Sequence, residues 1–224
     1  MGQVRFHVGQ VRFHHGEGHY VKAWNEIAFS LPQNAANDPA LTCQVSLSIM
    51  QSMSPPIYVF YELNGYYQNN RRYVISRSDG QLMNQNNPDT SLCSPQLNYA
   101  DNSSLPINPC GLTAWSFFND SYTASVISSG SPQPTVPLPV AISSTGFAPY
   151  SDQKYMFADY NASNFNPIIN QYRGGDNITG SVKQDDRFII WIKLAPLPKF
   201  RKLWGVINTP LNAGDTVLLT IVNR

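Results

Sequence analysis

The clearest alternation of apolar and polar positions lies at residues 44–49, where Val45, Leu47 and Ile49 are separated by polar side chains. A period of two is typical of a strand with one buried face. A second β-prone run, residues 57–61, follows a pair of prolines that ends the first. The N-terminal half of the chain therefore predicts two strands, the first of them half-buried.

Four more elements follow further along the chain. Residues 114–126 are rich in aromatic and β-branched residues and predict another β segment. Residues 188–194 are apolar on both faces, which predicts a central strand covered on each side. Residues 199–207 predict a short helix, and residues 216–222, which follow a turn, predict the last strand.

Long polar segments separate these elements. Residues 84–110 are rich in Asn, Pro, Ser and Asp, and residues 128–139 contain four prolines. A long amphipathic helical repeat is missing from the sequence. The predicted fold class is therefore mainly β: an antiparallel β-sandwich with long loops and a few short helices.

The N-terminus carries a near-exact tandem repeat, residues 2–8 and 9–15, and all four histidines of the chain lie within the first 19 residues. A zinc site needs ligands on a preformed scaffold, and no cysteine or carboxylate cluster accompanies these histidines, so we expect no metal. The repeat has no core-forming periodicity. It predicts a disordered or artefactual leader over residues 1–23, followed by a single β domain over residues 24–224.

Composition narrows the class of protein. Charged residues make up 13% of the chain, about half of the ~25% usual in globular proteins, and polarity comes mainly from amides and hydroxyls. This balance is typical of secreted or lumenal β domains. A net charge of +1 gives no electrostatic case for nucleic acid, and no stretch approaches the ~20 apolar residues of a membrane span.

The sequence offers little to a catalytic hypothesis. It contains no nucleophile elbow, phosphate-binding loop, zinc-protease motif or dinucleotide fingerprint. No histidine is available as a general base beyond the leader. Asp185 and Asp186 are adjacent carboxylates, which we interpret as a solvated turn before the strand that residues 188–194 predict. We expect no enzyme activity and no cofactor.

Two kinds of covalent modification are suggested by the residues themselves. Cys93 and Cys110 flank a polar loop of 16 residues, and a disulfide there would contribute roughly 3 kcal/mol in the chain-entropy model, although reduced thiols remain an alternative. Cys43 is the odd cysteine. Glycosylation sequons, about as many as chance predicts, occur at four asparagines: Asn102, Asn119, Asn161 and Asn177.

Residues 66–74 combine two adjacent arginines with three tyrosines and three amides. Arginine planes stack on tyrosine rings and present fixed forks of donors. The pair Arg71 and Arg72 could therefore clamp two elements of the domain together, or it could bind a partner. The residues alone leave both alternatives open, and the density of tyrosines around the pair makes the internal clamp our first hypothesis.

Four motifs occur in a fixed order along the chain. They are PPIYVFYELNGYYQNNRRYVISRSDGQL at residues 55–82, LPINPCGLTAWSFFND at residues 105–120, GFA with a following SD at residues 146–152, and FIIWIKLAPLPKFRKLWG at residues 188–205. Together they resemble the cell-division-control protein 50 family, also called ligand-effect modulator proteins or ALA-interacting subunits. The resemblance covers roughly residues 40–224. The departures from the family pattern are Asn70, Ile75, Pro149 and Lys193.

The resemblance implies function through a partner. Members of that family are non-catalytic β-subunits of type-IV P-type ATPases, the phospholipid flippases, and form heterodimers with the α-subunit. Their exoplasmic domain stabilises the α-subunit and supports exit from the endoplasmic reticulum and lipid transport. It lies on the lumenal or extracellular side of the endoplasmic reticulum, Golgi or plasma membrane. We expect this chain to match that domain without the family's membrane spans, so membrane association is expected only of a full-length protein.

The resemblance also assigns residues. It implies a disulfide between Cys93 and Cys110, an unpaired Cys43, and a glycan at Asn119 before the other three sequons. It further implies structural or interface roles for a set of motif residues: Tyr67, Gln68, Asn69, Arg71, Arg72, Tyr73, Trp191, Phe200, Arg201 and Lys202. The alternative from a different class is a secreted carbohydrate-binding β-sandwich, which the aromatic and amide-rich composition would suit.

Overall fold

A computed structural model describes most of the chain. The described residues are 3–9, 24–29, 41–130, 137–165, 175–178 and 180–223. By its internal contacts the chain divides into two compact units, where the sequence predicts one β domain over residues 24–224. One, here called the strand unit, comprises residues 1–65, 120–144 and 201–223, and the other, the helical unit, comprises residues 66–119 and 145–200.

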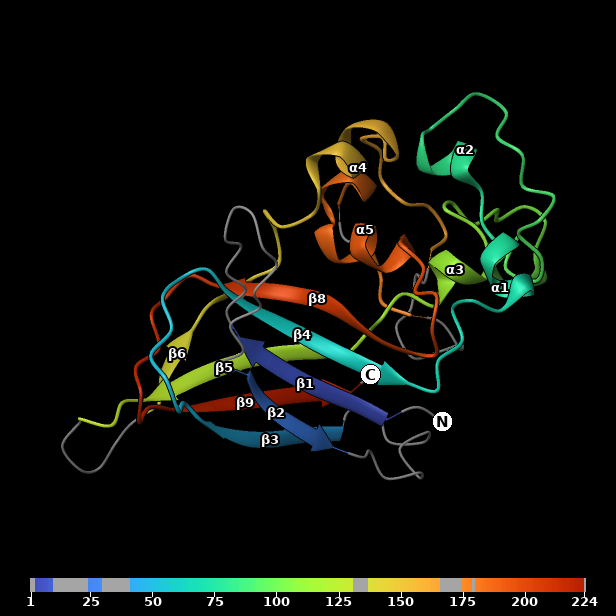
Figure 1. Cartoon of the computed structure of the whole chain (residues 1–224). Helices are drawn as coiled ribbons and strands as arrows, with labels where there is room; N and C mark the ends of the chain where they lie inside the picture. Colours follow the sequence, from blue (N-terminus) through green and yellow to red (C-terminus); the bar gives the residue numbers. More distant parts are fainter. Residues whose placement is uncertain are drawn as a thin grey trace, which may run out of the picture. The chain divides into compact units, whose positions relative to one another are not determined.

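The strands form two antiparallel sheets, which confirms the mainly β fold class (Figure 1). The five-stranded sheet has the order β2 (Trp24–Phe29), β1 (Gln3–Gly9), β4 (Ile57–Asn64), β8 (Lys199–Ile207) and β7 (Ile142–Ser143). The four-stranded sheet has the order β3 (Leu41–Ser48), β9 (Thr216–Asn223), β5 (Ser121–Ile127) and β6 (Leu138–Val140).

The core of the strand unit lies where the two sheets meet. Alternate residues of β4 are buried, and so are Val217, Leu219 and Ile221 of β9, as a period of two requires. Tyr122 of β5 and Trp204 of β8 join the sheets, with ring centroids 4.7 Å apart. The strands predicted over residues 44–49, 57–61 and 216–222 are therefore confirmed.

The strand predicted at residues 188–194 is wrong, because this segment is the helix α5 (Asp186–Ile192). Asp185 caps the helix by accepting a hydrogen bond from the Phe188 N–H at 2.9 Å. Burial all round is compatible with a core helix as well as with a central strand, so an apolar run alone does not separate the two. The solvated turn expected at Asp185 and Asp186 is also wrong, since Asp186 is buried.

The helix predicted at residues 199–207 is wrong as well, because this segment is β8 and lies between β4 and β7. Lys199 and Arg201 are exposed while Lys202 and Trp204 are buried, so the two faces of the strand differ in burial although both carry cationic residues. Gly205 permits β7 to approach, since a Cβ there would lie 2.7 Å from the Ser143 carbonyl oxygen. The β segment predicted at residues 114–126 is correct only from Ser121, where β5 begins.

Part of the predicted leader, residues 1–23, belongs to the five-stranded sheet. Gln3–Gly9 forms β1, which pairs with β4 in the register Phe6↔Tyr61 and with β2 on its other side. The remainder of the leader lies outside the described residues. Its predicted disorder therefore stays a prediction.

The helical unit contains short helices joined by long loops (Figure 1). They are α1 (Arg71–Ile75), α2 (Asp79–Leu82), α3 (Leu112–Trp115), α4 (Tyr150–Tyr155), α5, and the 3-10 turns η2 (Tyr99–Asp101) and η3 (Val182–Gln184). Phe188 is the centre of its core and meets the rings of Phe117, Phe157 and Phe165 at 5.4, 6.3 and 6.0 Å. Among the described residues, no helix is long and apolar enough to cross a membrane.

Candidate partner-binding site

Tyr66 is the centre of the motif at residues 66–74. Its ring packs edge-on against three others, those of Trp191 at 5.6 Å, Tyr73 at 6.0 Å and Phe200 at 6.3 Å. Its backbone N–H donates to the Pro198 carbonyl at 3.2 Å. Edge-to-face pairs of this kind each contribute about 0.5–1.5 kcal/mol beyond burial. The motif is therefore anchored by a tyrosine, and its neighbour Tyr67 is left exposed.

Two amide side chains fasten this motif to the segment that follows α5. Gln68 is fully buried, and its Oε1 accepts a hydrogen bond from the Ala195 N–H at 2.9 Å. Asn69 donates from Nδ2 to the Pro196 carbonyl, also at 2.9 Å. Both roles are structural. Gln68 satisfies the Ala195 N–H, and a buried N–H that lost its acceptor would cost about 1–3 kcal/mol.

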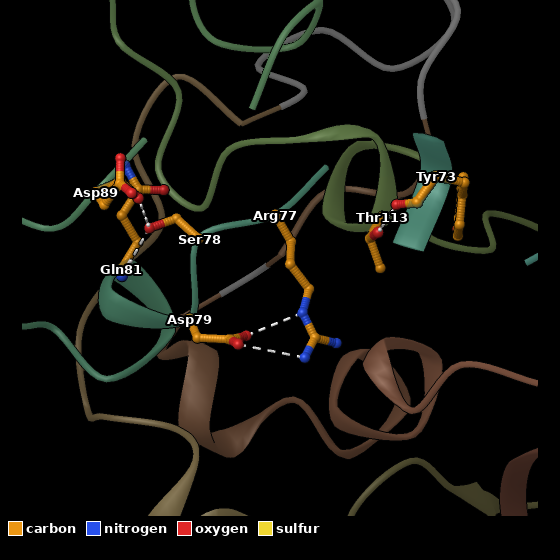
Figure 2. Close-up of polar contacts among 7 residues, drawn as sticks. All are labelled: Tyr73, Arg77, Ser78, Asp79, Gln81, Asp89 and Thr113. Carbon is orange, nitrogen blue, oxygen red and sulfur yellow. Dashed lines mark hydrogen bonds and ion pairs between the residues drawn. The ribbon is translucent and has the colours of Figure 1, made fainter. Parts of the chain in front are cut away.

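Thr113 joins three of the four motifs. Its Oγ1 donates to the Tyr73 carbonyl at 2.8 Å, as Figure 2 shows, and its own carbonyl accepts from Trp191 Nε1 at 2.9 Å. The Tyr73 hydroxyl lies 2.8 Å from Ser116 Oγ. Burial raises the pKa of the Tyr73 phenol well above its ordinary value of 10.0, so this hydroxyl stays neutral at physiological pH.

The disulfide lies beside this junction. Cys93 and Cys110 are joined by a disulfide, are both buried, and have Cα atoms 5.6 Å apart. The Cys110 N–H donates to Gln81 Oε1 at 2.8 Å. Gly111 has a φ of 101°, and a Cβ there would overlap the Ser76 carbonyl, so only glycine fits. Cys43 is a free cysteine of intermediate exposure.

Unlike the anchoring side chains Tyr66, Gln68 and Asn69, the two arginines make no contact within the described ranges that fastens the motif to the segment after α5. Asn70 caps α1 by accepting from the Arg72 N–H at 3.0 Å, and none of the helix residues is buried. Arg71 and Arg72 are both exposed, and among the described residues neither guanidinium makes an ion pair or stacks on a ring. The structure does not show the internal clamp, which leaves partner binding as the remaining interpretation.

Several exposed apolar side chains accompany the arginines. We define the motif surface as the exposed residues on and directly before α1: Tyr67, Arg71, Arg72, Val74 and Ile75. Buried Gln68 and the half-buried rings of Tyr66 and Tyr73 hold this segment against its neighbours. A mixture of tyrosine, arginine and aliphatic side chains is the composition enriched at the centres of protein interfaces.

The remaining motif residues are in β8 or beside it. Phe200 packs on Tyr66, whereas Lys202 is buried. Arg201 donates from Nε to Glu62 Oε2 at 2.8 Å, and Glu62 is buried in the neighbouring strand β4. A buried carboxylate needs such a partner, so we assign Arg201 a structural role in the sheet.

The four sequons differ in exposure. Asn102 and Asn161 are exposed, whereas Asn119 and Asn177 are half-buried. Glycosylation at these positions, with Asn119 foremost, stays a prediction. In the part of the chain that the structure describes, no group of three or more His, Cys, Asp or Glu side chains could hold a metal ion.

Sequence reasoning missed a buried carboxylate that joins two motifs. Asp186 accepts hydrogen bonds from the Phe147 N–H at 2.7 Å, the Ala148 N–H at 3.0 Å and Gln153 Nε2 at 2.8 Å. It therefore fastens α5 to the segment of the third motif. The sequence shows the adjacent carboxylates at 185–186 and the third motif at 146–152, but it does not show that the two would meet.

The neighbouring Asp185 gives a testable pH dependence. Burial raises its pKa above the ordinary 3.8, although the Phe188 N–H and Arg187 act against this. Between the ordinary and the raised pKa the folded chain binds more protons than the unfolded chain, so stability falls as pH rises through that window. Asp185→Asn keeps the helix cap and removes the charge. We expect it to match the parent at about pH 3 and to exceed it at about pH 7 in urea unfolding; a parent that is more stable at about pH 7 would contradict this.

With the fold and the motif surface described, comparison with known proteins gives the family. The model of the LEM3 (ligand-effect modulator 3) family / CDC50 family matches residues 12–224. The chain therefore belongs to this family, which confirms the resemblance seen in the four motifs.

The relatives in this family come from plants and animals. ALA-interacting subunit 3 of Arabidopsis thaliana is 36% identical over 191 residues, which cover 81% of this chain and 49% of the relative. Cell cycle control protein 50B of Homo sapiens is 33% identical over 195 residues, 79% of this chain and 53% of the relative. Cell cycle control protein 50C of Mus musculus is 31% identical over 204 residues. The chain spans about half the length of the curated relatives it matches.

Proposed function

We propose that this chain is the exoplasmic domain of a non-catalytic β-subunit of a type-IV P-type ATPase, a phospholipid flippase. The observation that carries the proposal is the motif surface: Arg71 and Arg72 are exposed, have no partner among the described residues, and lie on a helix directly after the anchors Gln68 and Asn69. Family membership supports it, and the plant relatives are named as proteins that interact with ALA.

Within the motifs, buried side chains hold the fold together and exposed side chains are left for a partner, as in a binding domain. The buried polar side chains Gln68 and Thr113, together with Asp186 just before the fourth motif, make hydrogen bonds that hold one motif against another. Arginine is suited to the exposed role, because its planar fork pairs with a carboxylate through two parallel hydrogen bonds. Binding to the α-subunit as a heterodimer would stabilise it and support its exit from the endoplasmic reticulum and lipid transport.

The proposed location follows from the same role. The domain would lie on the lumenal or extracellular side of the endoplasmic reticulum, Golgi or plasma membrane, where the disulfide of Cys93 and Cys110 persists. The carbohydrate-binding alternative would need exposed aromatic rings in a row on a sheet. The exposed tyrosines of the described residues, Tyr67, Tyr150 and Tyr155, all belong to the helical unit.

The test is co-purification with the partner. The full-length protein would be co-expressed with each type-IV P-type ATPase α-subunit of the same organism, and the complex isolated in detergent. Reversing both charges, Arg71→Glu with Arg72→Glu, is expected to lower affinity at least about tenfold, because interface arginines commonly contribute 1.4 kcal/mol or more. The melting temperature should stay within about 2 °C of the parent, as for exposed positions.

A matched control separates a specific contact from a change of net charge. Lys183→Glu alters charge in the same direction on η3, away from α1 in sequence, and should leave the complex intact. If Lys183→Glu weakened binding to the same degree, the loss of affinity in the arginine variant would reflect non-specific electrostatics and not a contact of Arg71 and Arg72. Failure of the unaltered protein to co-purify with any α-subunit would overturn the proposed function.

A further inference from the structure

A pocket of about 370 Å³ lies beside the motif surface, within the helical unit. Val74 of α1 and Met156, the residue after α4, form its rim, and Phe157 and Ile192 contribute buried apolar surface. Ligand pockets usually hold ~300–1,000 Å³, so this volume suits one or two apolar side chains better than a large ligand.

The rim of the pocket is unusually apolar for a surface. Val74 is 36% exposed, Met156 is 41% exposed, and Ile75 of the same helix is 44% exposed. Contiguous apolar side chains of this kind on a soluble domain mark interaction sites more often than chance exposure. Methionine is well suited to such a rim, because its flexible, polarisable side chain adapts to the group that enters.

The charges around the pocket are of two kinds. Arg77 and Lys193 line it, but each is already paired. Arg77 holds Asp79 through two contacts of 3.0 and 3.3 Å, shown in Figure 2, and Lys193 holds Asp152 at 2.7 Å. In each of these two ion pairs the positive and the negative charge compensate each other.

The uncompensated charge comes from α1. Arg71 lies three residues before Val74, so the two side chains share a helix face, and Arg72 stands in the same relation to Ile75. Neither guanidinium has a partner among the described residues. Arg71 therefore places beside the Val74 side of the pocket a positive charge that has no partner among the described residues, with Arg72 next to it in the chain, and an acidic occupant complements this charge.

We propose that this pocket receives an apolar side chain from an acidic exoplasmic loop of the α-subunit, with a neighbouring carboxylate of that loop bound by Arg71 and Arg72. The inference rests on the proposed function and specifies the chemistry of its partner. A phospholipid headgroup would also carry negative charge. The pocket volume of about 370 Å³ suits one or two side chains better than a pair of acyl chains, and a polypeptide can place its acid at α1 and its apolar group in the pocket.

The experiment uses the full-length protein co-expressed with an α-subunit that it co-purifies with, and measures the dissociation constant in detergent. Met156→Gln and Val74→Gln make the rim polar, and each is expected to weaken binding at least about tenfold. Met83→Gln and Leu105→Gln are matched controls, because Met83 is 39% and Leu105 is 36% exposed elsewhere in the unit. The controls should stay within about twofold, as most peripheral substitutions do.

A second arm tests the lipid. Vesicles containing phosphatidylserine would be offered to the same four variants. Unchanged affinity of Met156→Gln and Val74→Gln for the α-subunit would overturn the inference and leave the proposed function standing. Vesicle binding that depends on Met156 and Val74 would overturn it in favour of a lipid. If the unaltered protein binds no α-subunit, the proposed function fails and the inference falls with it. Met156→Leu, which keeps the rim apolar, should retain binding and excludes a mere folding defect.

Discussion

Replacing Trp191 by alanine is expected to lower the free energy of unfolding by about 3–5 kcal/mol, the usual cost of truncating a buried tryptophan. Trp191 is 1% exposed in α5. Its indole meets the ring of Tyr66 at 5.6 Å and donates from Nε1 to the Thr113 carbonyl at 2.9 Å. The substitution therefore removes an aromatic contact, leaves a buried carbonyl without its donor and opens a cavity at the junction of three motifs.

The loss should appear as a fall in melting temperature on the order of 10 °C. Trp191→Phe keeps a ring against Tyr66 but lacks the indole N–H, so an intermediate loss is expected, about 1–3 kcal/mol for the unpaired carbonyl and the smaller ring. Tyr67→Ala is the control, because Tyr67 belongs to the same motif but is exposed. A Trp191→Ala variant that melts within a degree or two of the parent would contradict the central place given to this side chain.

The elements that the sequence predicts correctly share one physical feature. β3, β4 and β9 each have one face in the core, so apolar residues recur at every second position. Such a pattern is compatible with a strand and with little else. The mainly β class follows from these elements together with the turn-rich segments between them.

The two wrong elements fail for opposite reasons. The α5 segment is apolar on every side, so its pattern has no period, and the cap that decides for helix is the single hydrogen bond at Asp185. In β8 the sequence lacks a clear period of two, because the cationic residues lie on both faces: Lys202 is buried, and Arg201 pairs with buried Glu62. A local cap therefore decided α5 and tertiary pairing decided β8.

The sequence predicted which residues form the candidate site, but not which of them are structural and which are exposed. The resemblance singled out residues 67–73. The structural role expected of Arg71 and Arg72 is performed instead by Tyr66, Gln68 and Asn69. Spacing cannot tell which of several neighbouring polar groups turns inward, because one turn of helix decides it. The motif surface thus became visible only once Asn70 was seen to cap α1.

Removing the disulfide is expected to cost about 2–4 kcal/mol, because the bridge between Cys93 and Cys110 closes a polar loop that has little apolar packing of its own. The loop is held otherwise by hydrogen bonds, such as those from the Gly111 N–H to the Gln96 carbonyl and from the Ile107 N–H to the Leu97 carbonyl. Without the bridge the unfolded chain gains freedom, and in the folded chain the position of α3 against α1 then depends on hydrogen bonds such as those from the Leu112 N–H to Ser76 and from Thr113 to Tyr73.

A set of serine variants makes this prediction specific. Cys93→Ser, Cys110→Ser and the double variant should lose nearly the same stability, since each removes the same bond, and the double loss should be far from additive. Cys43→Ser is the control and should have a small effect, because Cys43 is free. Reductant should lower the melting temperature of the parent toward that of the double variant and leave the double variant unchanged. A parent whose melting temperature does not respond to reductant under denaturing conditions that expose the bond would show that the bridge contributes nothing to stability.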